Sequence, residues 1–382
     1  MTVPVPGVRI VEGSGGSHPG SRAGTSVAVF IGRLPEAEGK LEFVSSWSDF
    51  QTRFLESGMP SGAAAWLPLA VRGFFANGGS SCHVAAITDA ETYVAELDLH
   101  LIALEAAEVG MIAVPDLFHD RNDAVADEIR AAVAEHCSAL GTRMAILDAP
   151  ADPAPESAET LATRLKEELL ATQTPFTTLY YPWLKVPGLT AGTTQEVPPC
   201  GHIAGAWARS DALRGIHKAP ANLTLLEVSG LSWDLIDEEH ARLHAKGVDC
   251  VRLLPGQGLT LWGARTLSDE PEWVQINVRR VVNALTQDIR MATRWVTDQK
   301  ELNTERLRAI VRNDVTAILT QWWRRGALKG VAAKDAFSVT CDDTNNPGSP
   351  VGPATLSIVA QVAPLHPAEF VTIRVSQTRA QN

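Results

Sequence analysis

The sequence lacks the signals of a membrane-spanning or a secreted, disulfide-bonded protein. Its 382 residues contain no uninterrupted apolar run approaching about 18 residues, and residues 1–10 lack the basic segment and apolar core of a secretory signal. The cysteines are odd in number, far apart and without a CxxC pair: Cys82, Cys137, Cys200, Cys250 and Cys341. They indicate reduced, mostly buried thiols rather than a disulfide framework or a zinc site. We therefore expect a cytoplasmic protein with no stable membrane insertion.

The common catalytic motifs are also missing. The sequence contains no GxSxG nucleophile turn, no GxxxxGK[ST] phosphate loop and no HExxH zinc motif. The segment Gly13-Ser14-Gly15-Gly16 follows a short candidate strand, but it lacks the later glycine and the immediate helix of a dinucleotide site. A flexible arm is the simpler interpretation. No cofactor is therefore expected.

Three smaller groups of residues could carry chemistry, and each has a simpler structural interpretation. His240 and His244 share one helical face and could bind zinc, but no third ligand is evident, so a polar exposed face is favoured. Asp116 follows an apolar strand, where α/β active sites place acids, yet a strand-end turn is the favoured explanation. Cys82 and His83 are adjacent on a strand and point to opposite faces, so they cannot easily pair as nucleophile and base. We expect neither a catalytic site nor a metal site.

The composition is that of a globular protein with two differently charged parts. Hydrophobic residues make up 45% and charged residues 20% of the chain, and the net charge of -11 argues against a nucleic-acid binder. Residues 256–382 carry 15 Lys and Arg against 12 Asp and Glu, a net charge of +3. The preceding residues carry 18 against 32, a net charge of -14. This asymmetry indicates that the two parts meet different partners.

Apolar strands alternate with helical patterns from Thr25 to about Leu254. We expect strands at residues 27–31, 83–87, 111–114, 144–147, 177–183, 223–228 and 248–254. We expect helices at residues 46–54, 63–75, 123–140, 156–171 and 236–245. Continuous apolar strands between helices are typical of a mostly parallel sheet flanked by helices on both faces, so the predicted fold class is α/β.

The C-terminal third follows a different pattern. Expected there are strands at residues 260–265, 337–341 and 355–362, and two long helices at about residues 272–297 and 304–325. In the second helix an apolar stripe is predicted from Leu307, Ile310, Val311, Val315, Ile318 and Trp322, with the opposite side formed by Arg306, Asn313, Thr320 and Arg324. Trp322-Trp323 could mark a ligand or membrane surface, but packing of the helix against a sheet or a neighbouring subunit is simpler. We predict an α+β C-terminal domain.

Both ends of the chain are predicted to be extended arms. Near the N-terminus a short strand is predicted from Val8, Arg9, Ile10 and Val11. The Gly/Ser-rich residues 13–24 that follow have too little apolar surface to fold alone. Near the C-terminus an edge strand is predicted from Phe370, Val371, Thr372, Ile373, Arg374 and Val375. The expected division is therefore an arm at 1–24, an α/β domain at 25–255, an α+β domain at 256–365 and an arm at 366–382.

Six groups of residues resemble, in order, the motifs of the contractile tail sheath family. They are Pro6-Gly7-Val8 with Gly24-Thr25-Ser26; Ala70 to Gly79 (AVRGFFANGG); Gly205 with Ala208-Arg209 and Asp211; Ala219 to Asn222 (APAN); Trp262 to Leu267 (WGARTL) with Val278-Arg279-Arg280; and Phe337 with Cys341-Asp342 and Pro367 to Phe370. Each group is modest alone, but together they span almost the whole chain and are specific. One departure is His217, which stands where an aromatic residue is common.

The resemblance implies a structural sheath subunit and not an enzyme. Subunits of this family stack as six-fold rings around a rigid inner tube, and contraction drives the tube through a target envelope. Their arms add strands to sheets of neighbouring subunits, which is a form of β-augmentation. The implied partners are other copies of the chain, an inner tube protein, baseplate proteins and terminal cap proteins, within a phage tail or a phage tail-like particle. Arg306 and Arg324 are candidate tube contacts because they project away from the apolar stripe, although ordinary solvated arginines fit equally well.

Two other functions stay open on the sequence alone. An α/β enzyme of unknown chemistry would need a cavity with convergent polar groups and a small, fixed oligomeric state. A non-contractile cap or collar relative of the sheath would share the fold, and shortened arms would favour it. Both predicted arms are present here.

Overall fold

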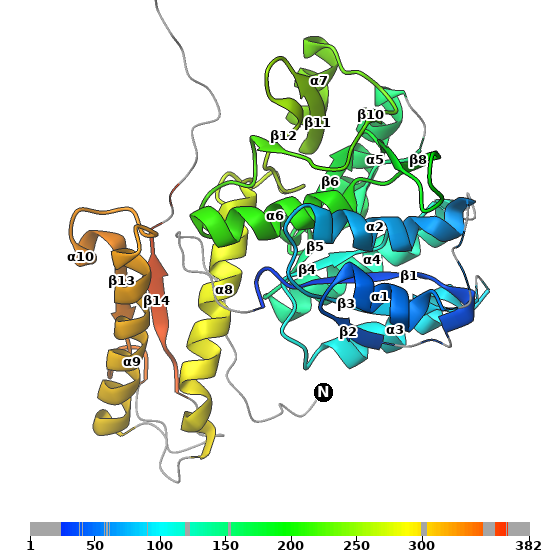
Figure 1. Ribbon diagram of the computed structural model, residues 1–382. Helices are drawn as coiled ribbons and strands as arrows, with labels where there is room; N and C mark the ends of the chain where they lie inside the picture. Colours follow the sequence, from blue (N-terminus) through cyan, green and yellow to red (C-terminus); the bar gives the residue numbers. More distant parts are fainter. Residues whose placement is uncertain are drawn as a thin grey trace, which may run out of the picture.

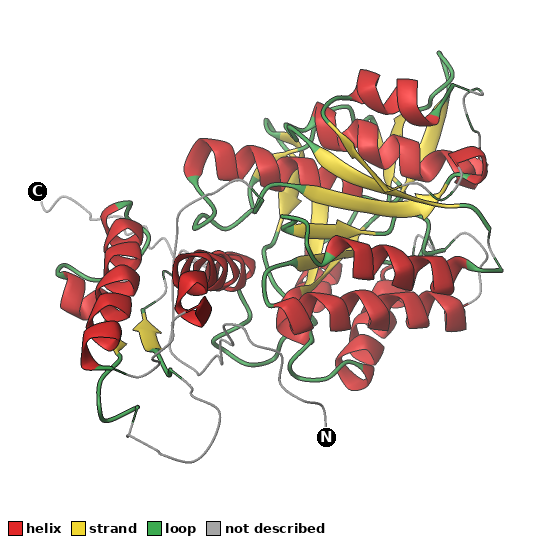
Figure 2. Ribbon diagram, turned by 90° about the horizontal axis from the view of Figure 1, so that it is seen from below, coloured by secondary structure: helices red, strands yellow, loops and turns green. Residues whose placement is uncertain are grey.

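The computed structural model describes residues 24–365, apart from residues 38, 40, 57, 59, 61, 90, 119–122, 152–153, 299–303, 347–355 and 364. A large α/β body and a smaller C-terminal unit lie side by side (Figure 1). Helix α8 (Ile276–Thr293) stands between them, as the view from below also shows (Figure 2). The predicted arm strands at residues 8–11 and 370–375 lie outside the described residues.

A nine-stranded sheet forms the centre of the body, in the order β2-β3-β1-β4-β5-β6-β11-β12-β9. Its strands are β1 (Ala28–Arg33), β2 (Leu41–Val44), β3 (Cys82–Ile87), β4 (Met111–Ala113), β5 (Met144–Asp148), β6 (Thr177–Tyr181), β9 (Leu223–Thr224), β11 (Val248–Leu254) and β12 (Gly258–Trp262). Neighbouring strands in the central part of this order, β3-β1-β4-β5-β6-β11, pair in parallel. The antiparallel strands β2, β12 and β9 lie toward the two edges. The expected mostly parallel sheet is confirmed.

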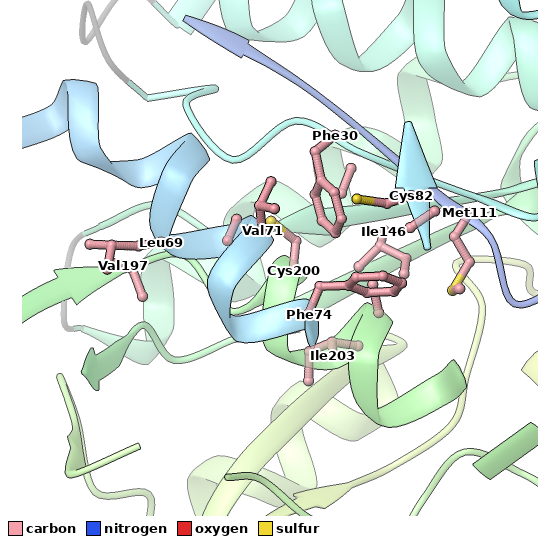
Figure 3. Close-up of a cluster of buried hydrophobic side chains, with 14 of the residues drawn as sticks. Phe30, Leu69, Val71, Phe74, Cys82, Met111, Ile146, Val197, Cys200 and Ile203 are labelled. Atoms are coloured by element: carbon pink, nitrogen blue, oxygen red, sulfur yellow. The ribbon is translucent and has the colours of Figure 1, made fainter. Parts of the chain in front are cut away.

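Helices cover both faces of the sheet, because successive strand residues point to opposite sides. One face packs against α1 (Trp47–Phe54), α2 (Trp66–Ala76) and α6 (Cys200–Arg214). The other packs against α3 (Tyr93–Leu104), α4 (Asp123–Leu140), α5 (Pro155–Glu168) and α7 (Asp237–Ala245). In β1, Phe30 belongs to the first face and Ile31 to the second, and both are fully buried. Figure 3 shows Phe30 beside Phe74 of α2, with the ring centroids 5.4 Å apart in an edge-to-face arrangement.

Two glycines of α6 allow it to lie very close to α2. A Cβ atom on Gly201 would stand 2.3 Å from the carbonyl oxygen of Ala70, and one on Gly205 would stand 2.4 Å from that of Phe74. Both obstacles are backbone atoms of a helix, so a larger residue at either position would push the two helices apart. Two of the sequence motifs, AVRGFFANGG and the segment around Gly205, therefore meet at one helix contact.

The remaining elements form a small sheet on the body and the C-terminal unit. The small sheet consists of β7 (Leu184–Pro187), β8 (Thr194–Val197) and β10 (Gly230–Leu231). The C-terminal unit contains α8, α9 (Glu305–Arg324), α10 (Ala333–Ala336), β13 (Phe337–Thr340) and β14 (Val359–Val362). Short 3-10 helices occur at Pro35–Ala37, Gly62–Ala65, Thr174–Phe176 and Arg294–Asp298.

The body extends further along the chain than the expected boundary. That boundary, between residues 255 and 256, falls in the hairpin turn that joins β11 to β12. Antiparallel pairing across the turn, from Cys250 with Trp262 to Leu254 with Gly258, keeps β12 in the large sheet. The chain leaves the body only with α8.

The buried stripe of α9 differs from the expected one at two positions, because Leu319 is buried in place of the partly buried Ile318, and Ile310 is exposed. Leu307, Val311 and Val315 are buried, and the stripe continues through Leu319 to Trp322. Ile310, expected on this stripe, is 40% exposed. The reason is that the buried face follows a spacing of four residues from Leu307, and Ile310 lies to one side of it.

Candidate subunit interface

The sheet of β13 and β14 covers its core incompletely. The strands are antiparallel, with Phe337 opposite Val362 and Val339 opposite Ala360. These four side chains pack against the apolar core between α8 and α9. Each of them is only partly buried, whereas every residue of β4, β5 and β6 in the body is buried. The C-terminal unit therefore carries a two-stranded sheet whose apolar side chains are only partly buried.

Within the described residues, both outer edges of this sheet are open. There β13 pairs with β14 and neither strand has a second neighbour. On the face turned away from the helices, Ser338 donates a hydrogen bond to Gln361 at 3.1 Å, and Val359 is 44% exposed. An open edge presents backbone N–H and C=O groups to which another strand can bind. The geometry thus fits the addition of one strand at either edge.

The two candidate arginines lie on the exposed side of α9. Arg306 and Arg324 are both exposed, and neither forms an ion pair with another described residue. They are separated by five full turns, so they share one side of the helix at about 27 Å from each other. They flank a surface and do not form a cluster.

The fully exposed positions of α9 between these arginines are uncharged, and the partly exposed Asp314 lies beside them. The fully exposed residues recur at spacings of three or four and are Ile310, Asn313, Ala317 and Gln321. We call this set, with Arg306 and Arg324, the α9 stripe. A helix face whose fully exposed positions are uncharged in the middle and positive at both ends can lie against a surface of negative potential.

Asp116, considered above as a possible catalytic acid, closes a strand-end turn. Its carboxylate accepts hydrogen bonds from the backbone N–H of Arg33 and from the hydroxyl of Tyr93, both at 2.6 Å. Cys82 and His83 lie on opposite faces of β3, and burial raises the pKa of the Cys82 thiol. These groups hold the body together and do not converge on a common point.

A buried acid that the sequence pattern does not single out lies at the end of β5. Asp148 Oδ1 accepts a hydrogen bond from the backbone N–H of Cys200 at 2.9 Å. Burial raises the pKa of Asp148 to about 7, against the opposing effect of this hydrogen bond. The signal available in the sequence was its place directly after the apolar residues 144–147. Because the side chain is 1% exposed, it is part of the core of the body.

A depression of the body is lined by residues other than these acids. It has a volume of about 600 Å³ and is lined by Gly39, Leu41, Thr88, Glu96, Leu99 and His100. Glu96 is occupied there by hydrogen bonds from Thr88 and Thr92. His100, which also lines the depression, has its Nε2 at 3.1 Å from the carbonyl oxygen of Ala86, so both titratable side chains are engaged within the body.

The two histidines of α7 lie side by side but are not joined by a third candidate metal ligand among the described residues. The rings of His240 and His244 are 5.9 Å apart, and burial lowers the pKa of His240 to about 4. Across the residues that the structure describes, no three His, Cys, Asp or Glu side chains gather in a way that could hold a metal ion. In the same residues, no helix combines the length and apolar character needed to cross a bilayer.

Comparison with known sequences identifies related proteins. Residues 89–267 match the phage tail sheath protein central domain, and residues 268–378 match the phage tail sheath C-terminal domain. A tail sheath protein of Vibrio phage KVP40 is 29% identical over 186 residues, 48% of this chain and 26% of that protein. A tail sheath protein of Salmonella phage ViI is 27% identical over 154 residues, 39% of this chain and 23% of that protein. The chain thus spans about a quarter of the length of these curated relatives.

Solved structures match over nearly the whole chain. The helical sheath of the anti-feeding prophage in its contracted state has a TM-score of 0.75 and 28% identity, covering 99% of this chain and 100% of that one. The sheath complex of the PVC extracellular contractile injection system, also contracted, has a TM-score of 0.71 and 25% identity, covering 99% of each chain. With two adjoining domain matches over residues 89–378 and these full-length likenesses, the chain belongs to the phage tail sheath family.

Proposed function

We propose that this chain is the subunit of a contractile sheath, which stacks in six-fold rings around an inner tube and contracts to drive the tube through a target envelope. The observation that carries the proposal is the open sheet of β13 and β14, whose edges can accept strands from other copies. The assemblies that this chain resembles include contracted sheaths and a baseplate that was symmetrised six-fold. The proposed role is structural and not enzymatic.

The arms are proposed to supply the strands. Residues 8–11 and 370–375 alternate as edge strands do, and the glycine-rich residues 13–24 give the N-terminal arm its reach. One arm strand at each outer edge would turn the pair β13-β14 into a four-stranded sheet. Each main-chain hydrogen bond contributes roughly 0.5–1.5 kcal/mol net, so a strand of four residues links two subunits while its flexible root lets them rotate.

Contraction in this scheme is mechanical. The extended sheath is held in a kinetically trapped state, and release at the baseplate allows each ring to rotate into better-packed contacts without a cofactor. The proposed partners are other copies of the chain, an inner tube protein, baseplate proteins and terminal cap proteins. The subunits assemble in the cytoplasm and become part of a phage tail or a phage tail-like particle. The α9 stripe is the proposed contact with the tube.

Negative-stain electron microscopy of the full chain, expressed alone, tests the proposal. We expect striated hollow cylinders, and we expect them to be lost from a chain that lacks residues 1–20. A sharper variant, Val8→Pro with Ile10→Pro, keeps the length of the arm but removes two backbone N–H donors on one edge of its strand. The matched control, Val8→Thr with Ile10→Thr, keeps the donors and the strand propensity.

Cylinders are expected from the control and not from the proline variant. Small discrete oligomers of the full chain, even with tube protein added, would instead favour an α/β enzyme. Polymers that form but do not shorten on triggering would favour a cap or collar relative.

A further inference from the structure

The beginning of α8 contacts the residues at which both arms leave the described chain. Arg280 Nη2 donates a hydrogen bond to the carbonyl oxygen of Thr25 at 3.0 Å. One turn earlier, Asn277 Nδ2 donates to the carbonyl oxygen of Leu365 at 3.3 Å. Thr25 and Leu365 lie next to the predicted N-terminal and C-terminal arms. Since positions three apart share one side of a helix, the roots of the two arms converge on one patch of α8.

The N-terminal root is held by a buried ion pair. Arg280 binds Asp211 of α6 through two hydrogen bonds, Nη1 to Oδ1 at 2.9 Å and Nη2 to Oδ2 at 2.5 Å. The two side chains are 2% and 1% exposed. The hydroxyl of Ser26 donates to the same carboxylate at 3.0 Å, and the guanidinium lies 4.7 Å from the ring centroid of Trp207. Residues 25 and 26 are thus fixed to α6 and α8 at once.

The C-terminal root is held by a buried amide. Asn277 is 1% exposed, and its Nδ2 donates both to Leu365 and to the carbonyl oxygen of His217 in the body, the latter at 3.1 Å. Two residues before Leu365, the backbone N–H of Ala363 donates to Ala336 at 2.8 Å. The chain that leaves β14 is therefore tied to the body through α8 as well as to its own unit.

The helix that carries these contacts is itself fixed in the body. Arg279 lies between the rings of Phe176 and Trp273, at 4.3 and 4.4 Å from their centroids. Asn283 Nδ2 donates to the carbonyl oxygen of Arg143 at 3.2 Å. A displacement of this part of α8 would break these contacts, and an unpaired polar group is costly where the site is buried.

We propose that the first two turns of α8 form a clamp for both arms: Arg280 with Asp211 fixes the root of the N-terminal arm, and Asn277 fixes the root of the C-terminal arm. The inference rests on the proposed function insofar as the arms link subunits. A pull through either arm then reaches the body and the C-terminal unit together. Slack at a root would instead let an arm stretch while the neighbouring ring stayed in place.

Amide hydrogen exchange of the full chain before it assembles tests the clamp directly. Two amides report on the roots: Val27, whose N–H donates to Gly24, and Ala363, whose N–H donates to Ala336. Asn277→Leu removes the C-terminal contact, and we expect exchange at Ala363 to rise about 10-fold with Val27 unchanged. The pair Asp211→Asn with Arg280→Gln removes both charges together, and we expect the opposite pattern, a rise of about 10-fold at Val27 alone.

Asn283→Leu is the matched control. It removes an equally buried asparagine of α8 that also donates to a backbone carbonyl of the body, but not at an arm root. It should lower the melting temperature as Asn277→Leu does and leave both reporter amides unchanged. Electron microscopy of the same variants should show short or irregular cylinders for the two clamp variants and regular ones for the control.

The outcomes separate the clamp from the sheath proposal. Root exchange that follows global stability, alike in Asn277→Leu and Asn283→Leu, would overturn the clamp. Selective loosening of the roots in a protein that never polymerises would support the clamp and count against the sheath. Regular cylinders from both clamp variants, despite loosened roots, would show that the clamp does not serve assembly and would overturn its proposed role.

Discussion

The sheets of the body and of the C-terminal unit differ in how their edges and faces are covered. In the body, six parallel strands are closed at both sides by antiparallel strands, and helices bury both faces. In the C-terminal unit, two strands of four residues each have helices on one face only, and their described edges are open. A sheet of two strands is marginal in water unless something packs on it. The comparison indicates that the body contributes most of the buried core, while the C-terminal unit contributes the open strand edges to which, in the proposed function, other subunits bind.

The largest expected difference between the two regions concerns aromatic core residues. Phe74→Ala in α2 removes a fully buried ring that contacts Phe30, and it should lower the free energy of unfolding by about 3–5 kcal/mol. Phe337→Ala in β13 removes a partly buried ring, and we expect a loss below about 2 kcal/mol. Urea denaturation of the unassembled full chain measures both. Equal losses in the free energy of unfolding would show that the core under the C-terminal sheet is packed as fully as the core of the body.

A second prediction concerns acid, because the body buries two ionisable groups whose effects oppose each other. Burial, and secondarily Arg72, lowers the pKa of His202 from 6.5 to about 4. As the pH falls from 6.5 toward 4, the unfolded chain binds a proton at this site that the folded chain does not, so stability falls by about 1.4 kcal/mol per pH unit. Asp148, with its pKa raised from 3.8 to about 7, keeps a proton in the folded state that the unfolded chain loses above pH 3.8, so its contribution to stability grows as the pH falls through the same window.

Single substitutions separate these two effects. His202→Leu should make stability less sensitive to pH between 6.5 and 4, and Asp148→Asn should make it more sensitive. His136 and His240, with pKa values also lowered to about 4, act in the same direction as His202 and keep a residual slope in both variants. Urea midpoints at pH 7.5, 6 and 5 give the slopes. Parallel curves for the two variants and the parent chain would contradict the assignment.

The elements that the sequence predicts well are those with one apolar and one polar face. Helix α4 has the expected bounds, because its period is clear and Gly141, at a φ of 65°, ends it. The predicted cap of α1 is also present, since Ser46 Oγ accepts the backbone N–H of Asp49 at 3.1 Å.

Two helices of the body escape prediction because they lack that contrast between faces. In α3, Leu99 and Ile102 are exposed although the opposite face is apolar too, so no period stands out. Helix α6 begins directly after Pro198-Pro199, contains Gly201 and Gly205, and is buried on nearly all sides. Glycine and proline normally lower helix propensity, but here tight packing against α2 decides the structure.

The contacts of the proposed clamp could not be predicted from the spacing of residues in the sequence. Asp211 and Arg280 each stand in a motif that resembles the sheath family, but their pairing joins residues 69 positions apart. Contacts of that range depend on how the helices are placed over the sheet, which a single sequence does not specify. Both positions have other charged residues close by, Arg209 near Asp211 and Arg279 beside Arg280, so the sequence does not show which charges are buried.

The smallest expected effect on stability comes from substitutions in the α9 stripe. These substitutions therefore best separate an effect on assembly from an effect on the stability of the folded subunit. Arg306→Glu with Arg324→Glu changes two exposed side chains that have no ion-pair partner among the described residues, so the free energy of unfolding should change by less than about 0.5 kcal/mol per site.

Assembly should respond quite differently to the same change. With tube protein present, extended sheath on tube should be abolished, because two reversed charges would face a surface of like sign. The control, Arg306→Lys with Arg324→Lys, preserves the charges and should assemble normally. Sedimentation of sheath with tube protein, followed by electron microscopy, measures the outcome. Undiminished assembly of the glutamate variant would show that these are ordinary solvated arginines and would move the tube contact to another face of the C-terminal unit.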